Sequence, residues 1–163
     1  MEAIDDGSQR LMIVASAIAS SLHLLALAIG LPSIWLRARA LRTPIEPARL
    51  GSVFAADTAW GIAALLWLAT GPLRTFPRLE KGAQFYLHSR MFGLKMALFV
   101  LVLVLELWPM ITLIRWRMAV ARGQPPDLGQ APALRVLSLV ECGLVIAIVF
   151  VASLMARGVG FAR

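Results

Sequence analysis

Four long apolar runs dominate the sequence and limit what the chain can fold into. They cover about residues 11–36, 50–73, 91–114 and 134–156, and each is close to the ~20 residues needed to cross about 30 Å of hydrocarbon. Lipid offers the backbone no hydrogen bonds, so each run must form a helix, and four runs are too few to close a barrel. The sequence therefore predicts an all-α integral membrane protein with four transmembrane helices in a single domain, residues 1–163.

The segments between the runs are short, which makes neighbouring helices antiparallel and favours an up-down-up-down bundle. We expect these connections over residues 37–49, 74–90 and 115–133. The last of them carries Gly123, Pro125, Pro126 and Pro132, so it cannot continue as one helix.

Charge is sparse and lies at the ends of the runs. The net charge is +7, yet only 15% of the residues are charged and 60% are hydrophobic. Basic residues in these positions are typical of anchors at the surface of a lipid bilayer, so we expect no nucleic-acid partner. The flank before the first run is acidic, whereas Arg37, Arg39 and Arg42 follow it. The positive-inside rule then places both termini outside. In this orientation eight basic residues flank the inner ends of the runs and seven flank the outer ends, which agrees with the rule by a small margin.

Ionisable residues inside a membrane cost free energy and need an explanation. Five lie within the runs: His23, Asp57, Lys95, Glu106 and Glu141. Helical steps of seven or eleven residues return to the same face, so His88, Lys95 and Glu106 form one stripe along the third run. His23, Asp57 and Glu141 share their helix faces with small and polar residues. Such residues are typical of contacts between membrane helices, so we expect each of the four helices to turn its polar face inward.

Depth along the helices predicts that three carboxylates meet near the inner surface. Asp57 and Glu141 each lie seven residues from the inner end of a run, or about 10 Å deep, and Glu106 lies at a similar level. Three carboxylates so close require a proton or a cationic partner. The nearby candidates for this pairing are Arg37, Arg115 and Arg135. The cluster is interpreted either as a polar contact that holds the helices together or as a proton or cation pathway.

His23 has two interpretations, as an axial ligand of a b-type heme or as a hydrogen-bonding residue between helices. His88 fits poorly as a second axial ligand, because its depth differs from that of His23 by about 15 Å. Lys95, Met91 or Met96 could stand opposite instead, and Lys95 could equally pair with a carboxylate or a backbone carbonyl. The single cysteine, Cys142, supports no disulfide and no cysteine-based metal site, and we expect no metal site.

The sequence carries no recognisable catalytic motif. It has no hydrolase elbow, phosphate-binding loop, dinucleotide fingerprint or metalloprotease motif, and only one tyrosine and two histidines. We therefore expect a non-catalytic bundle that serves as an accessory or assembly subunit, with another membrane protein or a second copy as its partner. A heme protein using His23 and a proton or cation pathway through Asp57, Glu106 and Glu141 are the alternatives.

Several segments resemble a bacterial family of four-helix predicted membrane proteins of unknown function. The likeness covers nearly the whole chain and is carried by DTAWGIAALLWLATGPLRTF (57–76), KGAQFYLHSRMFGLKMALF (81–99) and LMARGVG (154–160). It implies a multi-pass protein of the bacterial inner membrane and brings no established activity.

A more distant likeness is to copper-resistance protein D and to heme-associated protoporphyrinogen oxidases of four helices. It rests on a first-span histidine in SLHLLA (21–26) and a third-span lysine in LKMA (94–97). The resemblance implies a role near heme for His23. The chain departs from both families, because it has no Met- and His-rich cluster for copper and lacks the wider oxidase signature.

Overall fold

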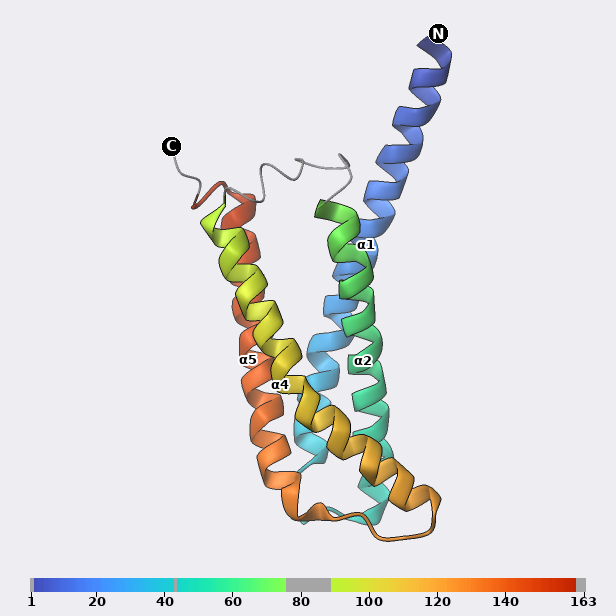
Figure 1. Cartoon of the computed structure of the whole chain (residues 1–163), viewed down its shortest axis with the longest axis vertical. Helices are drawn as coiled ribbons and strands as arrows, with labels where there is room; N and C mark the ends of the chain where they lie inside the picture. Colours follow the sequence, from blue (N-terminus) through green and yellow to red (C-terminus); the bar gives the residue numbers. More distant parts are fainter. Residues whose placement is uncertain (1, 43, 76–88, 161–163) are drawn as a thin grey trace.

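The computed structural model describes residues 2–42, 44–75 and 89–160. Over these ranges, long helices run up and down along one axis (Figure 1). They are α1 (Glu2–Ala40), α2 (Pro47–Thr75), α4 (Arg90–Ala121) and α5 (Ala131–Ala156), with the short 3-10 helix η1 (Leu128–Gln130) before α5. All four long helices have the length and apolar composition to cross a membrane. The predicted all-α fold with four spans is therefore confirmed.

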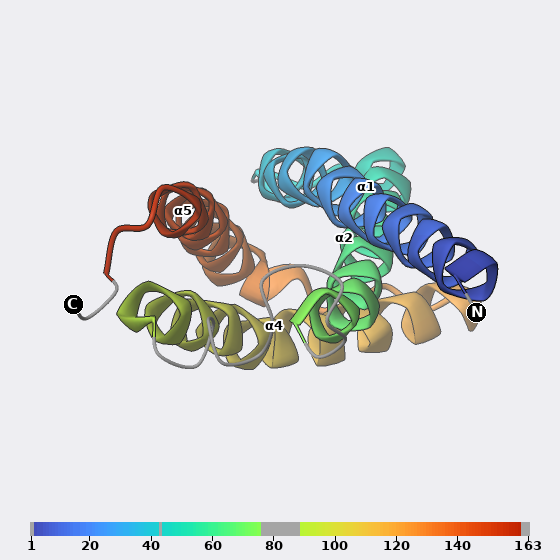
Figure 2. The same cartoon turned by 90° about the horizontal axis from the view of Figure 1, so that it is seen from above.

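The helices pack mainly as two pairs. α1 packs along α2 and α4 packs along α5, while α1 also contacts α5 and α2 contacts α4 only slightly. Seen from above (Figure 2), α1 and α2 lie on one side and α5 on the other, and α4 runs along a third side from α5 towards α2. The connections from α1 to α2 and from α4 to α5 both lie at the lower end of Figure 1.

Gly30 sets the close approach of α1 to α2. A Cβ atom at Gly30 would lie 3.0 Å from both Ala63 Cβ and Trp67 Cη2, closer than packed carbon atoms normally come. His23 lies seven residues before Gly30 on α1, and Thr70 lies seven residues after Ala63 on α2. These two side chains are also in contact, which fits the same antiparallel register. In this register α2 ends level with about residue 18 of α1, so α1 extends beyond its neighbour by about 24 Å.

Two layers of apolar side chains form the core. The lower core lies near the helix connections and consists of Leu41, Leu50, Val53, Leu113, Trp116, Ala131 and Leu134. The middle core takes one residue from each long helix: Ile34, Trp60, Val102 and Val145. Other large apolar side chains point outward along every helix, as expected where lipid replaces water.

α1 and α4 continue at least four residues past the C-terminal ends of the predicted apolar runs and carry arginines with them. The residues from Arg37 to Ala40 were expected in a connection, but they belong to α1. Likewise α4 continues through Arg115 and Arg117 to Ala121. Nothing in these stretches breaks a helix, because arginine is a good helix former. Past the end of α4, Gly123 takes a positive φ of 70°.

Candidate functional site

A buried arginine stands at the centre of the bundle. The side chain of Arg37 is 0% exposed. Its Nε donates to Ser138 Oγ at 3.0 Å, and its Nη1 donates to Asp57 Oδ1 at 3.2 Å and to Glu106 Oε1 at 2.7 Å. Its Nη2 donates to Glu106 Oε2 and to Glu141 Oε2, both at 2.7 Å. We call Arg37, Asp57, Glu106 and Glu141 the Arg37 cluster; one member comes from each long helix.

The local sequence explains why this cluster is enclosed. On α1, Arg37 comes three residues after Ile34 of the middle core and four before Leu41 of the lower core, so all three share one helix face. The other helices likewise place their carboxylates between residues of the two cores. The charged groups are therefore sealed above and below by apolar layers, which strengthens their mutual attraction.

The geometry satisfies most of the hydrogen-bonding groups. The planar guanidinium meets Glu106 through two parallel bonds, the arrangement that suits arginine better than lysine. Ser138 accepts from Arg37 and donates its own hydroxyl to the Leu134 carbonyl at 2.9 Å. Burying charges is costly unless they are paired and hydrogen-bonded, so the bonds of Arg37 compensate for removing the cluster from water.

Arg117 extends the cluster from α4 to α2. Its Nη2 donates to Asp57 Oδ2 at 3.0 Å, to the Phe54 carbonyl at 2.6 Å and to Thr58 Oγ1 at 3.1 Å. The guanidinium carbon also lies 4.9 Å from the centre of the Phe54 ring, within the range of a cation–π contact. Its side chain is 37% exposed, so this ion pair lies at the edge of the core.

Sequence reasoning named the three carboxylates, and the structure brings them together. Of the arginines considered as partners, Arg37 is the central one, while Arg115 is exposed and Arg135 lines a surface cavity. Arg117 was missed. The signal that could have found it is spacing, because Arg117 lies eleven residues after Glu106 and so continues the polar stripe of α4.

The charges of this site do not balance if every group is ionised. Three carboxylates face two guanidinium groups, Arg37 and Arg117, which leaves one excess negative charge. The side chain of Glu141 is fully buried, and within the described residues its Oε1 has no hydrogen-bond partner. A proton on this oxygen would balance the charge, because a buried carboxyl favours its neutral form.

His23 lies higher in the bundle and connects α1 to α2. Its Nδ1 lies 2.8 Å from Thr70 Oγ1, and its backbone carbonyl accepts from Trp67 Nε1 at 3.2 Å. Since Thr70 donates its hydroxyl to the Leu66 carbonyl at 2.6 Å, the histidine is the donor in the first bond. Lys95 is half-buried on α4, and His88 lies outside the described residues. Heme binding by these residues stays a prediction.

The arrangement suits helix cross-linking better than cation passage. Arg37 occupies the space between the carboxylates and uses the oxygens that an entering cation would need. Across the described part of the chain, no group of three or more His, Cys, Asp or Glu residues could hold a metal ion. What the site offers chemically is a fixed ionic junction of four helices with one unbonded carboxyl oxygen.

Fold and site together define a multi-pass α-helical membrane protein whose helices are joined by a buried ionic network. The chain belongs to DUF2214, a family of predicted membrane proteins, and residues 15–160 match the family. This confirms the predicted membership in a membrane protein family of unknown function. No curated protein and no solved structure matches the chain, and the distant likeness to copper-resistance and oxidase families stays a prediction.

Proposed function

We propose that this protein is a non-catalytic accessory or assembly subunit of the bacterial inner membrane, held rigid by the Arg37 cluster. The observation that carries the proposal is the apolar N-terminal part of α1, which extends beyond α2. The arginine-rich lower end would face the cytoplasm by the positive-inside rule, which places this extension on the opposite side.

Residues 11–14 of this extension are apolar on more than one face. Leu11, Met12, Ile13 and Val14 are four consecutive residues, and their exposed fractions range from 48% to 73%. A helix that is apolar all round is normally covered by protein or by lipid. The apolar run of α1, about residues 11–36, is about 39 Å long as a helix, which exceeds the ~30 Å hydrocarbon layer at the average tilt of about 20°. A partner helix packed on residues 11–14 would cover this excess.

The interior supports a structural role as well. The carboxylates of the Arg37 cluster bind the guanidinium groups of Arg37 and Arg117, and His23 bonds a neighbouring helix. Side chains committed to fixed helix contacts are preorganised for rigidity and are poorly placed to take up substrate.

The proposal is tested by placing a photo-crosslinking amino acid at Ile13 in cells that naturally make the protein. Leu65, which is 68% exposed on α2, serves as the matched control because it faces outward within the span of the bundle. We expect Ile13 to give one adduct of constant mass containing the same second protein in every preparation, whereas Leu65 gives none.

Three results would contradict the accessory role. The first is an identical adduct pattern from Ile13 and Leu65, which would mean that lipid surrounds both sites equally. The second is an adduct containing only a second copy of the chain, which would make the protein a homo-oligomer. The third is turnover of a small substrate by the purified protein alone.

Glu141 favours a second candidate function, a proton-binding step across the membrane. Its buried Oε1 lacks a partner among the described residues, and the site carries one carboxylate more than its guanidinium groups balance. Proteoliposomes with an internal pH-sensitive dye would test this. We expect the wild-type protein to dissipate an imposed pH gradient and Glu141→Gln to do so at the rate of empty liposomes, with exposed Glu46→Gln as control. Equal rates for wild type, Glu141→Gln and empty liposomes would exclude it.

A further inference from the structure

The lower end of the bundle contains an open cavity between α1 and α5. Its volume is about 200 Å³, and it is lined by Trp35, Ala38, Arg39, Arg42, Arg135 and Leu139. On α1, Trp35 and Arg39 lie four residues apart and share one face, and Arg42 lies two residues past the end of the helix. Arg135 and Leu139 likewise share one face of α5. Three guanidinium groups and three apolar side chains therefore surround one space.

The positive charge of this cavity is uncompensated within the described residues. None of Arg39, Arg42 and Arg135 forms an ion pair there. The carboxylates at this end are already engaged: Asp57, Glu106 and Glu141 with Arg37, Glu46 with Arg49, and Asp127 with the Gly129 N–H. Like charges repel when they gather around one space, so an anion that enters gains from all three guanidinium groups.

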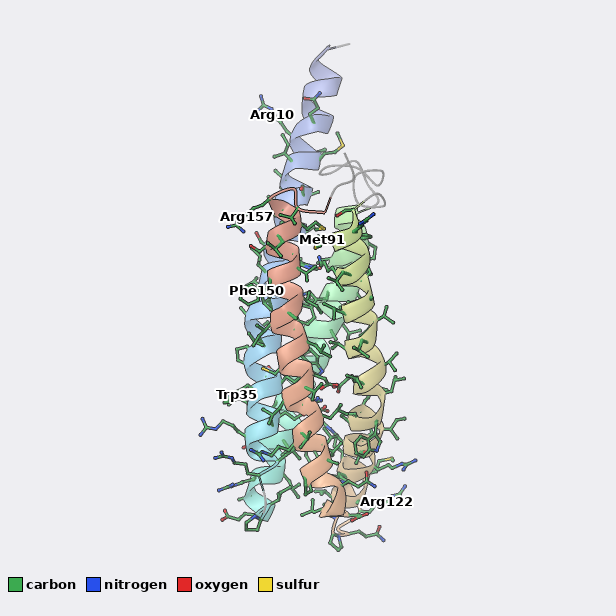
Figure 3. The ribbon with its side chains drawn as sticks, turned by 90° about the vertical axis from the view of Figure 1, so that its left-hand side faces the viewer. Arg10, Trp35, Met91, Arg122, Phe150 and Arg157 are labelled. Carbon is green, nitrogen blue, oxygen red and sulfur yellow. The ribbon has the colours of Figure 1, made fainter. Side chains whose placement is uncertain are left out.

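The position of the cavity selects an amphiphilic anion. Trp35 is 49% exposed and lies on the outer edge of α1 in the lower part of the bundle (Figure 3), where tryptophan marks the boundary between lipid and water. Along α5, Ile146 and Phe150 lie on the same face as Arg135 and Leu139 and point outward. Phe150 lies above Trp35 towards the same side of Figure 3. An acyl chain along this face of α5 would leave its headgroup at the arginines.

We propose that this cavity binds the phosphate headgroup of an anionic phospholipid, with its acyl chains along α1 and α5. Arginine binds phosphate oxygens through paired N–H groups, and basic pockets between transmembrane helices take such headgroups. The three arginines hold the phosphate, Trp35 covers the glycerol region, and Leu139 begins the apolar wall. The site is distinct from the Arg37 cluster, whose guanidinium group is enclosed between the two cores.

Native mass spectrometry of the purified full-length protein would test the proposal. The protein is equilibrated with equal amounts of phosphatidylglycerol and phosphatidylcholine, and the bound lipid is identified from the mass. We expect one phosphatidylglycerol per chain to be retained in preference to phosphatidylcholine. Each arginine that contacts the bound headgroup contributes about fivefold to its affinity, so replacing Arg39, Arg42 and Arg135 together by Gln should reduce this preference by about 100-fold.

A matched variant separates the cavity from net charge. Replacing Arg49, Arg115 and Arg122 by Gln removes the same charge from exposed positions at the same end, and we expect the lipid preference to change by less than about twofold. A third variant carrying Lys at the cavity positions keeps the charge and should retain an intermediate preference, because lysine cannot form the paired bonds. Each variant is first checked for wild-type helix content by circular dichroism.

Three outcomes would overturn the proposal. One is a wild-type protein that binds both lipids equally. Another is an equal loss of preference in the cavity and matched variants, which would show a general effect of net charge. The third is displacement of phosphatidylglycerol by millimolar inorganic phosphate at low ionic strength, since this would make the cavity a site for free phosphate in place of lipid.

Discussion

Replacing Arg37 by methionine should be among the most destabilising single changes in this protein. Methionine keeps an unbranched apolar stem similar to that of arginine but removes the guanidinium group, so Glu106 and Glu141 lose the partner that neutralises them. Asp57 keeps its second ion pair with Arg117, so its negative charge remains paired in the variant. The matched control is Arg39→Met, two residues further along α1, where the side chain is exposed.

The magnitude follows from the bonds that are lost. Five hydrogen bonds to Arg37, at about 1.5–3 kcal/mol each for charged partners, would sum to more than 7 kcal/mol, comparable with the whole stability of many domains. Bonds that share one guanidinium group are not independent. Breaking a buried ion pair costs about 3–5 kcal/mol, and we use that range. For a chain of this size it corresponds to a fall in Tm of roughly 6–20 °C.

The assay uses the only cysteine of the chain. Cys142 is half-buried on α5 beside Glu141, so a maleimide dye that fluoresces on reaction reports the separation of the helices during a thermal ramp in detergent. We expect Arg37→Met to react at a temperature lower by the amount given above. Arg39→Met should stay within about 2 °C of wild type, because single exposed charges contribute little.

Charge repair provides the second arm of the experiment. In the Arg37→Met protein, changing Glu106 and Glu141 to Gln removes the two unpaired charges, and at least half of the lost Tm should return. Equal Tm values for Arg37→Met and Arg39→Met would refute the central role of Arg37. Failure of the two Gln substitutions to restore stability would show that packing, and not unpaired charge, accounts for the loss.

Three further predictions use the same thermal assay. Gly30→Ala should destabilise the protein by about 1–3 kcal/mol through overpacking between α1 and α2, whereas Gly61→Ala, with no atom within 4 Å of the new Cβ, should be neutral or stabilising because alanine favours helix. His23→Leu and Thr70→Val should show a coupling energy of about 0.5–1.5 kcal/mol in a double-mutant cycle, the net value of one hydrogen bond. Arg117→Gln should cost about 1–2 kcal/mol, less than the loss of Arg37, because its side chain is partly exposed.

Each of these has a result that contradicts it. Gly30→Ala as stable as Gly61→Ala would mean that the helices can separate at no cost. Additive effects of the changes at His23 and Thr70 would show that the two side chains do not interact. An Arg117→Gln protein as unstable as Arg37→Met would mean that the edge ion pair is as important as the buried one.

The sequence by itself determined the number of spans and the faces that turn inward. Twenty or more consecutive apolar residues have one stable conformation in lipid, and a charge within such a run must be sheltered by other helices. Helical spacing therefore sufficed to predict that Asp57, Glu106 and Glu141 lie near one another. The same spacing would have included Arg117, had the stripe of α4 been followed beyond the apolar run.

Only the tertiary structure decided which cation enters the cluster and which stays at the surface. Arg37, Arg39 and Arg42 look alike in sequence, as basic residues after an apolar run. In the fold, Arg37 is enclosed and binds three carboxylates, whereas the other two line the open cavity. Arg37 and Arg39 are two residues apart, so their side chains point about 200° apart around the axis of α1. Which of these directions faces the interior depends on where the other helices lie. Hydropathy carries no information on that rotation, because packing between the helices sets it.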